Sequence, residues 1–222
     1  MNVLCVAVLY KILLQEDCDF FDVRLGGRTS HPLYFYNHPC QKIPANLDNF
    51  YLFKLAYHFY ELGHTLVLDR KRVDFVEYAL HHFLTFSLIL FSYSVGYLPI
   101  GAAVMILHDV TDLGCSVFKL TIDITPTAVE VIGYIGMVVP WLYVRLWFFP
   151  AHVISRIFEE MNSWHGVRIN RHMMIMLTVF LIVLFCMHIF WFYLMVKGLL
   201  RRFQAKTWKS GISFATNANN VE

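Results

Sequence analysis

The chain has 222 residues, of which 58% are hydrophobic and only 15% charged, whereas ordinary soluble domains carry about 25% charged residues. This balance indicates a membrane protein. The net charge is +2 and the basic residues form short clusters between apolar runs, which excludes the extended basic face of a nucleic-acid-binding protein. The five cysteines are scattered without a CxxC pair, so the sequence predicts neither a disulfide framework nor a zinc site.

The apolar segments set the expected architecture. Residues 1–14 would extend about 21 Å as a helix, whereas the hydrocarbon core is about 30 Å thick, so we expect a partial transmembrane segment there. Residues 15–49, with three prolines and several acids, are predicted to form an extramembrane loop near the interface. Five longer apolar stretches follow, each long enough to cross the bilayer as a helix: residues 50–68, 75–97, 100–120, 128–149 and 173–196.

Short basic segments indicate the orientation of the chain. Arg70, Lys71 and Arg72 lie between the first two full spans, and the residues after the last span are also basic. Because lysine and arginine beside span ends are retained on the cytoplasmic side, both segments are predicted to be cytoplasmic. We therefore expect an all-α polytopic bundle of five full spans plus a partial N-terminal one, with one helical domain at 50–203 and a cytoplasmic polar tail at 204–222.

The second full span carries a polar face. An ionisable side chain inside a span is costly unless it is paired or lines a cavity, so each one is a candidate functional residue. Thr85 and Ser92 follow His81 by four and eleven residues, which at about 100° per residue places them along one face. His82 lies about 100° away and shares its face with Tyr93. The two histidines are therefore expected to point in different directions.

The next span carries a second polar face. Asp109 and Asp112 are three residues apart, and Ser116 and Lys119 continue the same face. His108 points to the side. Four such groups on two neighbouring spans, the two histidines and the two aspartates, are costly to keep without a function.

The connection between these two spans brings the polar faces together. Only residues 98–99 separate them, so we predict an antiparallel hairpin whose polar faces meet each other or a shared cavity. Counted from the turn at about 1.5 Å per residue, His82 and Asp112 differ in depth by about 5 Å. Asp109 is about 10 Å from His82 in depth, so side chains bridge the first gap more easily.

This combination of groups suits an amide-forming acyl transfer. A carboxylate hydrogen-bonded to one imidazole nitrogen sets the tautomer and strengthens the other nitrogen as a base or nucleophile. A protonated amine must lose a proton before it attacks an acyl carbonyl, and a buried base contributes about 10² to 10⁴ in rate. A water-poor site also protects the acyl group from hydrolysis.

Other polar residues in the spans have an ordinary structural explanation. A single membrane histidine such as His58 or His188 more often makes a helix-packing hydrogen bond. Lys54, His58 and Glu61 share a face of the first full span and are expected to neutralise each other. Arg145 is compatible with either a structural or a functional role.

The two polar spans contain a set of motifs in a defined order: His81-His82-Phe-Leu-Thr85, Ser92-Tyr93, Gly101, His108-Asp109-Val-Thr-Asp112 and Lys119. These motifs resemble the signature of the ceramide synthase branch of the TLC-domain family, and the likeness extends over roughly residues 32–203. Members of that family commonly have an arginine shortly before the glycine, where this chain has Leu98-Pro99-Ile100, and they start earlier with a complete first span or spans.

The resemblance implies an enzyme of the endoplasmic-reticulum membrane that uses a fatty acyl-CoA to N-acylate a sphingoid base, with its C-terminus cytoplasmic and 50–203 as its catalytic domain. It implies that His81 or His82 is the base or the acyl acceptor. Asp109 and Asp112 would orient and charge-balance the histidines.

The resemblance also bears on partners and on the cavity. No metal or organic cofactor is implied, since acyl-CoA is a substrate; the lipid bilayer surrounds the protein, and a homodimer or a heterodimer is compatible with the family. The loop at about 151–172 is implied to influence acyl-chain length. Further candidates for the wall of the substrate cavity are Thr85, Ser92, Tyr93, His108, Ser116, Lys119, Arg145, His188 and Trp191.

Three alternatives stay open at this point. A non-catalytic TLC-domain protein that binds or senses lipid would use the same cavity. A membrane metal hydrolase would use histidine and aspartate as ligands of Zn²⁺ or Fe²⁺. A proton-coupled transporter would use them as proton relay groups.

Overall fold

The computed structural model describes residues 2–15, 34–35, 38, 40, 42–121, 127–162 and 171–204. All regular secondary structure in these residues is helical, as the sequence predicts. Most of the predicted loop at 15–49 and of the predicted tail at 204–222 lies outside the described residues. The elements are α1 (Asn2–Leu13), α2 (Leu47–Val67), α3 (Phe75–Ser94), α4 (Leu98–Thr121), α5 (Thr127–Pro140), the π-helix η1 (Trp141–Ile154), α6 (Ser155–Asn162) and α7 (Arg171–Gln204).

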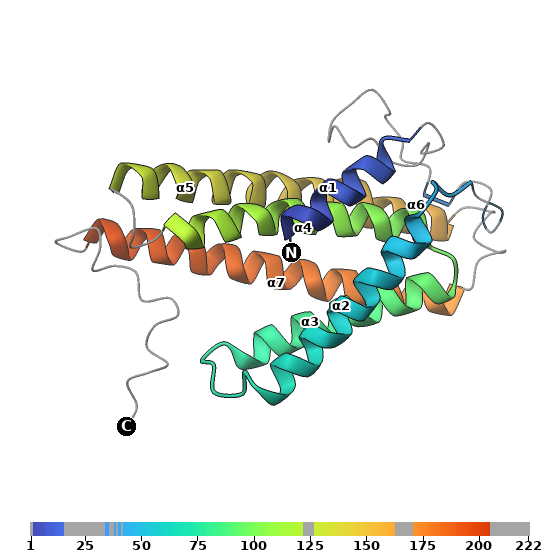
Figure 1. The fold of residues 1–222 in the computed structure, drawn as a ribbon, viewed down its shortest axis with the longest axis horizontal. Coiled ribbons are helices and arrows are strands. Elements are labelled where there is room, and N and C mark those ends of the chain that lie inside the picture. Colours follow the sequence, from blue (N-terminus) through green and yellow to red (C-terminus); the bar gives the residue numbers. More distant parts are fainter. Residues whose placement is uncertain are drawn as a thin grey trace.

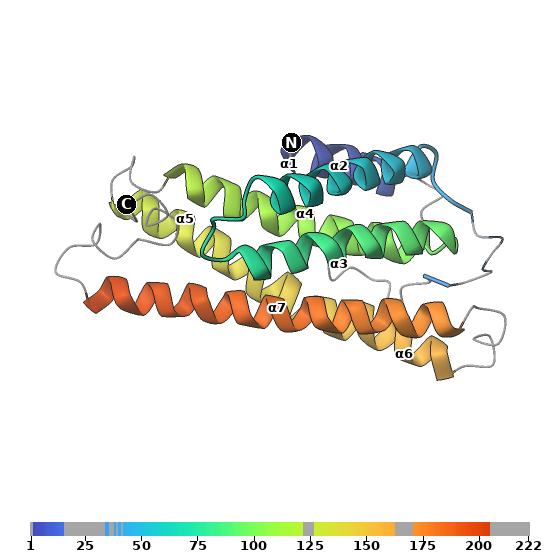
Figure 2. The same ribbon diagram turned by 90° about the horizontal axis from the view of Figure 1, so that it is seen from below.

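The helices form a bundle with α3 and α4 at its centre. α1 and α2 lie on one side of this central pair and α7 on the other (Figure 2). α5, η1 and α6 follow one another without a break and pack against α4 and α7 (Figure 1). Successive long helices alternate in direction, so the α2–α3 loop and the end of α7 lie at one end of the bundle, and the α3–α4 turn lies at the other (Figure 1).

Four helical stretches in the described residues are long and apolar enough to cross a membrane. They are α3, α4, Val129–Asn162 and Arg171–Arg201. α2 coincides with the first expected full span, but it contains Asp48, Lys54 and Glu61 and is not among the four. α1 is a shorter apolar helix. The chain is thus a multi-pass membrane protein, and the expected count of five full spans plus a partial one is not confirmed.

The helix expected at 128–149 is longer than predicted. Its described course runs through α5, η1 and α6 to Asn162, so residues 151–162, expected to begin a loop, are helical. The pairing changes from α to π directly after Pro140, which lacks the N–H that an α-helix would bond to the residue four positions earlier. The wider π pairing begins at this point, and the helix continues instead of ending.

A tight turn joins α3 to α4 and confirms the predicted hairpin. It occupies residues 95–97, just before the expected position at 98–99. Gly96 has a φ of 75°, in the left-handed region that glycine adopts readily. The Tyr97 N–H donates to the Ser92 carbonyl at an N···O distance of 2.8 Å. The turn therefore places the end of α3 directly beside the start of α4.

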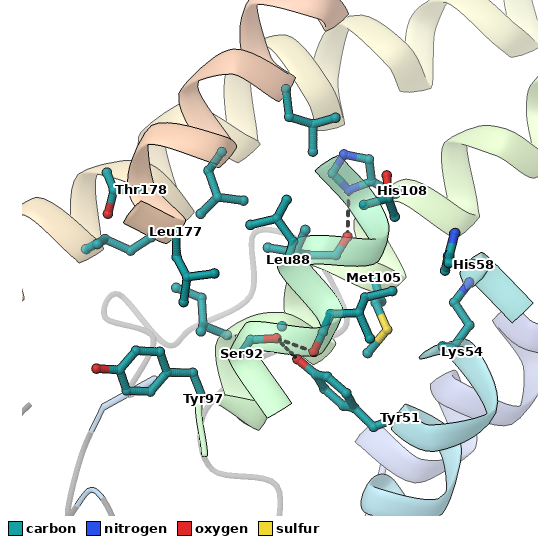
Figure 3. A pocket seen from close by; sticks show the side chains of 18 of the residues that line it. Tyr51, Lys54, His58, Leu88, Ser92, Tyr97, Met105, His108, Leu177 and Thr178 are labelled. Carbon is teal, nitrogen blue, oxygen red and sulfur yellow. Dashed lines mark hydrogen bonds between the residues drawn. The ribbon is translucent and has the colours of Figure 1, made fainter. Parts of the chain in front are cut away.

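Close packing near this turn depends on Gly101 of α4. Tyr51 of α2 is completely buried, and its hydroxyl oxygen lies 2.7 Å from Oγ of Ser92 on α3 (Figure 3). A Cβ atom at position 101 would lie 1.6 Å from that tyrosine hydroxyl. The close packing of α2, α3 and α4 at this point is possible because residue 101 has no side chain.

We expect Gly101→Ala to destabilise the protein by about 1 to 3 kcal/mol, the usual cost of overpacking, because the new methyl group displaces Tyr51. The measurement is the thermal midpoint of unfolding in detergent, followed by intrinsic fluorescence. Gly136→Ala in α5 is the matched control, since a Cβ there has no neighbour within 4 Å and alanine is favoured over glycine in a helix by about 1 kcal/mol. A thermal midpoint for Gly101→Ala as high as that of the control would contradict this packing.

Candidate active site

A cavity that is partly open to the surroundings lies between α2, α3, α4, α6 and α7; the empty space in and around it, open solvent included, is about 810 Å³. Its wall is apolar on the side of α6 and α7 and polar on the side of α2 (Figure 3). The apolar side includes Ile157, Met174, Leu177, Leu181 and Leu184. An apolar cavity with a few convergent polar groups is the usual form of a site for a small amphipathic molecule.

The paired histidines leave α3 in different directions, as predicted. His81 lines the cavity and His82 does not; the ring of His82 packs against Tyr78 with the centroids 4.4 Å apart. Nδ1 of His81 and both ring nitrogens of His82 are buried without a hydrogen-bond partner in the described structure. Trp191 packs against the His81 ring, with centroids 5.1 Å apart, but is not part of the cavity wall.

Asp109 on α4 forms an ion pair with Lys54 on α2. Nζ of Lys54 lies 2.8 and 3.0 Å from the two carboxylate oxygens. Lys54 is 3% exposed and Asp109 is 9% exposed, and both line the cavity. From the sequence, Lys54, His58 and Glu61 of α2 are expected to neutralise each other, and the pairing of Lys54 with α4 is not predicted. The signal for that pairing is the lysine itself, because a lysine inside an apolar segment needs a carboxylate partner.

Asp112, one turn further along α4, forms an ion pair with Arg145 of η1. Nε of Arg145 donates to Oγ1 of Thr111 at 2.6 Å, and Nη2 donates to the carbonyl oxygen of His108 at 3.1 Å. The guanidinium carbon also lies 4.1 Å from the ring centroid of Trp141, within the range of a cation–π interaction. Arg145 is 2% exposed and lies outside the cavity wall, so it fastens η1 to α4.

The expected hydrogen bonds between the aspartates and the paired histidines are not made among the described residues. Asp109 and Asp112 accept hydrogen bonds from cations on other helices instead. A full positive charge stabilises a buried carboxylate more than a neutral imidazole does. Both carboxylates nevertheless line the same cavity as His81.

His108 and His188 form a second histidine pair that joins α4 to α7. Nδ1 of His108 lies 2.7 Å from the Val104 carbonyl oxygen, which only accepts, so this nitrogen carries the proton. In neutral rings, Nε2 of His108 then accepts from Nε2–H of His188 at 3.1 Å. His108 lines the cavity, whereas His188, fully buried, does not and serves as its packing partner.

The remaining predicted residues divide between the cavity wall and its surroundings. Thr85 and Ser92 line the cavity, and Tyr93, Ser116 and Lys119 do not. The hydroxyls of Thr85 and Ser116 each donate to the carbonyl oxygen four residues earlier, both at 2.8 Å, while Lys119 is exposed near the end of α4. In the described parts of the chain, no group of three His, Cys, Asp or Glu side chains is placed to hold a metal ion.

The basic loop before α3 is organised by an ion pair of its own. Nε and Nη2 of Arg72 lie 2.9 and 3.0 Å from the carboxylate oxygens of Asp74. This two-point hydrogen bond holds the pKa of Asp74 below its usual value. The Arg72 guanidinium also lies 4.2 Å from the ring centroid of Tyr78, the residue that packs on His82. The loop is thereby connected to the helix that carries both histidines.

Known families and proteins match most of the chain. Residues 3–197 match the family model described as the TLC domain. "Ceramide synthase LOH2" of Arabidopsis thaliana is 28% identical over 214 residues, which covers 89% of this chain and 69% of the relative. "Ceramide synthase 4" of Mus musculus is 34% identical over 179 residues, 77% of this chain and 42% of the relative. "Ceramide synthase hyl-2" of Caenorhabditis elegans is 28% identical over 173 residues, 72% of this chain and 51% of the relative.

The chain spans about half or less of the length of these two animal relatives. No solved structure matches it. The family match begins in α1 and ends within α7, so it includes every helix that borders the cavity. The chain therefore belongs to the TLC-domain family, as the resemblance of its paired-histidine and HDxxD motifs predicts.

Proposed function

We propose that the protein is an acyltransferase of the ceramide synthase type, which moves a fatty acyl group from acyl-CoA to the amine of a sphingoid base. The observation that carries the proposal is the position of His81, whose ring lines a largely apolar cavity together with two aspartates and keeps a buried Nδ1 without a partner. The names of relatives that match most of this chain support the same reaction class.

The proposed chemistry needs one group that handles a proton or an acyl group. The amine of a sphingoid base is protonated at neutral pH and must lose a proton before it attacks the thioester carbonyl. His81 either takes this proton or first accepts the acyl group on a ring nitrogen and then passes it to the amine. In both courses the C–S bond of the thioester breaks, coenzyme A leaves as the thiol, and a C–N amide bond forms.

The other residues have supporting roles in this proposal. The apolar side of the cavity suits the acyl chain and keeps water from the activated acyl group. Asp109 and Asp112 balance charge in the wall, through Lys54 and Arg145 rather than through direct bonds to the histidines. His82 is not part of the cavity wall, so we assign the chemistry to His81. Acyl-CoA is a substrate, and no further cofactor enters the proposal.

A non-catalytic protein that binds or senses lipid is the second candidate. One observation favours it: both aspartates are already paired with cations, so in this arrangement neither strengthens a histidine as a base. The two candidate functions use the same cavity. They differ in whether His81 is required for a reaction or only borders a bound lipid.

We expect His81→Ala to lower ceramide formation by at least about 10²-fold, the range for loss of a positioned base. His82→Ala, at equal abundance, is expected to retain more activity because its ring lies outside the cavity. The measurement is ceramide formed from acyl-CoA and sphinganine in membranes without other ceramide synthases. Activity of His81→Ala equal to wild type contradicts the assignment, and an inactive wild type that still cross-links a photoactivatable lipid supports the second candidate.

We also propose that the protein lies in the endoplasmic-reticulum membrane with the α2–α3 loop and the C-terminus on the cytoplasmic side. The loop contains Arg70, Lys71 and Arg72, and it lies at the same end of the bundle as the end of α7 (Figure 2). Basic residues beside span ends are retained in the cytoplasm. Assembly as a homodimer or heterodimer stays a prediction.

The orientation predicts a labelling pattern in sealed microsomes. Two variants with a single cysteine each are compared. The variant whose only cysteine is Val73→Cys, at an exposed position of the α2–α3 loop, is expected to react with a membrane-impermeant maleimide. The variant that keeps only the natural Cys40, which is exposed and precedes α2, is expected to react only after permeabilisation. Reaction of both in sealed vesicles contradicts the crossing of the membrane by α2, and the reverse pattern contradicts the orientation.

A further inference from the structure

Lys54 is the buried cation that α2 adds to the cavity wall. Among the described residues, Lys54 and Arg145 are the lysine or arginine side chains that are almost completely buried. Each pairs with one of the two aspartates on α4. The two cations differ in where they lie and in what else they contact.

Arg145 has enough contacts to explain it as a structural residue. Besides Asp112, its guanidinium group contacts the Thr111 hydroxyl, a backbone carbonyl and the ring of Trp141. It lies behind the cavity wall rather than in it. Its position between α4 and η1 makes it a fastening between two helices, and this role requires no substrate.

Lys54 lacks a comparable set of partners. Both of its hydrogen bonds within the described structure go to Asp109, and the ring centroid of Tyr57 is 5.8 Å away, at the outer limit of a cation–π interaction. Lys54 and Asp109 both line the cavity. Since a buried ion pair is often no more stabilising than apolar residues of similar size, packing alone does not account for a lysine here.

The ion pair between Lys54 and Asp109 affects the orientation of the Asp109 carboxylate in the cavity wall. An ammonium group within hydrogen-bond distance of both oxygens holds the carboxylate in one orientation. It also keeps a negative charge in the wall without leaving it uncompensated in an apolar environment. Asp109 lies one helical turn from Asp112 and shares the cavity with His81.

We propose that Lys54 is a positioning residue for acyl transfer, which holds the carboxylate of Asp109 in the orientation and charge state that the reaction in this cavity requires. The inference rests on the proposed function. It adds to the paired-histidine and HDxxD residues a group from α2, a helix that carries none of these motifs.

The test is a series of substitutions, Lys54→Arg, Lys54→Gln and Lys54→Met, assayed for ceramide formation and normalised to folded protein. Arginine keeps the charge and can donate two parallel hydrogen bonds to the carboxylate, so kcat is expected to stay within about threefold of wild type. Glutamine keeps a donating but neutral NH2 group and is expected to lower kcat about tenfold, and methionine, which has no donor, about 10²-fold. KM for acyl-CoA is expected to change little, because the substitutions act on an aspartate rather than on acyl-CoA itself.

Thr65→Val is the matched control, because Thr65 is a buried polar residue of the same helix whose hydroxyl has no partner in the described structure and which is not part of the cavity wall. Its activity and its thermal midpoint are expected to match wild type. If the Lys54 variants show lower thermal midpoints but unchanged kcat per folded molecule, the pair is only structural and the inference fails.

Three further outcomes are distinguishable. Should Lys54→Met not fold, the comparison of Lys54→Arg with Lys54→Gln decides: equal kcat values overturn the inference, and a lower value for glutamine supports it. A wild-type protein that makes no ceramide overturns the proposed function together with this inference. An active wild type with equally active Lys54→Gln and Lys54→Met overturns the inference alone.

Discussion

Asp109 is buried inside the bundle, where breaking a buried ion pair costs about 3 to 5 kcal/mol. Asp112 lies one helical turn further along α4 and is only partly buried. Neither carboxylate is neutralised from within α4. Lys54 reaches Asp109 from α2, and Arg145 reaches Asp112 from η1. The positions of three helices are thus linked by the requirement that two charges on the central helix be compensated.

The cavity follows from how these helices meet. α3 and α4 are held together near their turn, where Tyr51 occupies the space left by Gly101. At the level of the charged pairs, polar contacts join α4 to α2 on one side and to η1 on the other, and the His108–His188 bond joins α4 to α7. Apolar side chains of α6 and α7 border the space between these contacts. The cavity therefore has a polar side and an apolar side.

This arrangement leaves the histidines with different roles. His108 uses both ring nitrogens in hydrogen bonds to α4 and α7, and His82 packs beneath Tyr78 outside the cavity. His81 lines the cavity and has an unpartnered buried Nδ1, and His58 of α2 has the same two properties. The direction in which each of the two adjacent histidines leaves α3 therefore separates the one that borders the cavity from the one that does not.

Much of this was available from the sequence. Apolar length predicts the spans of α3, α4 and α7, the short connection predicts the α3–α4 hairpin, and the step of about 100° per residue predicts that His81 and His82 diverge. The motifs predict the family. Periodicity, however, describes how residues are arranged around the axis of their own helix, and it contains no information on which neighbour that face meets. The pairing of Lys54 with Asp109 and of Arg145 with Asp112, the absence of His–Asp bonds among the described residues, and the exclusion of His82 from the cavity were decided by tertiary structure, because buried charges pair with whichever opposite charges the packing of other helices brings within reach.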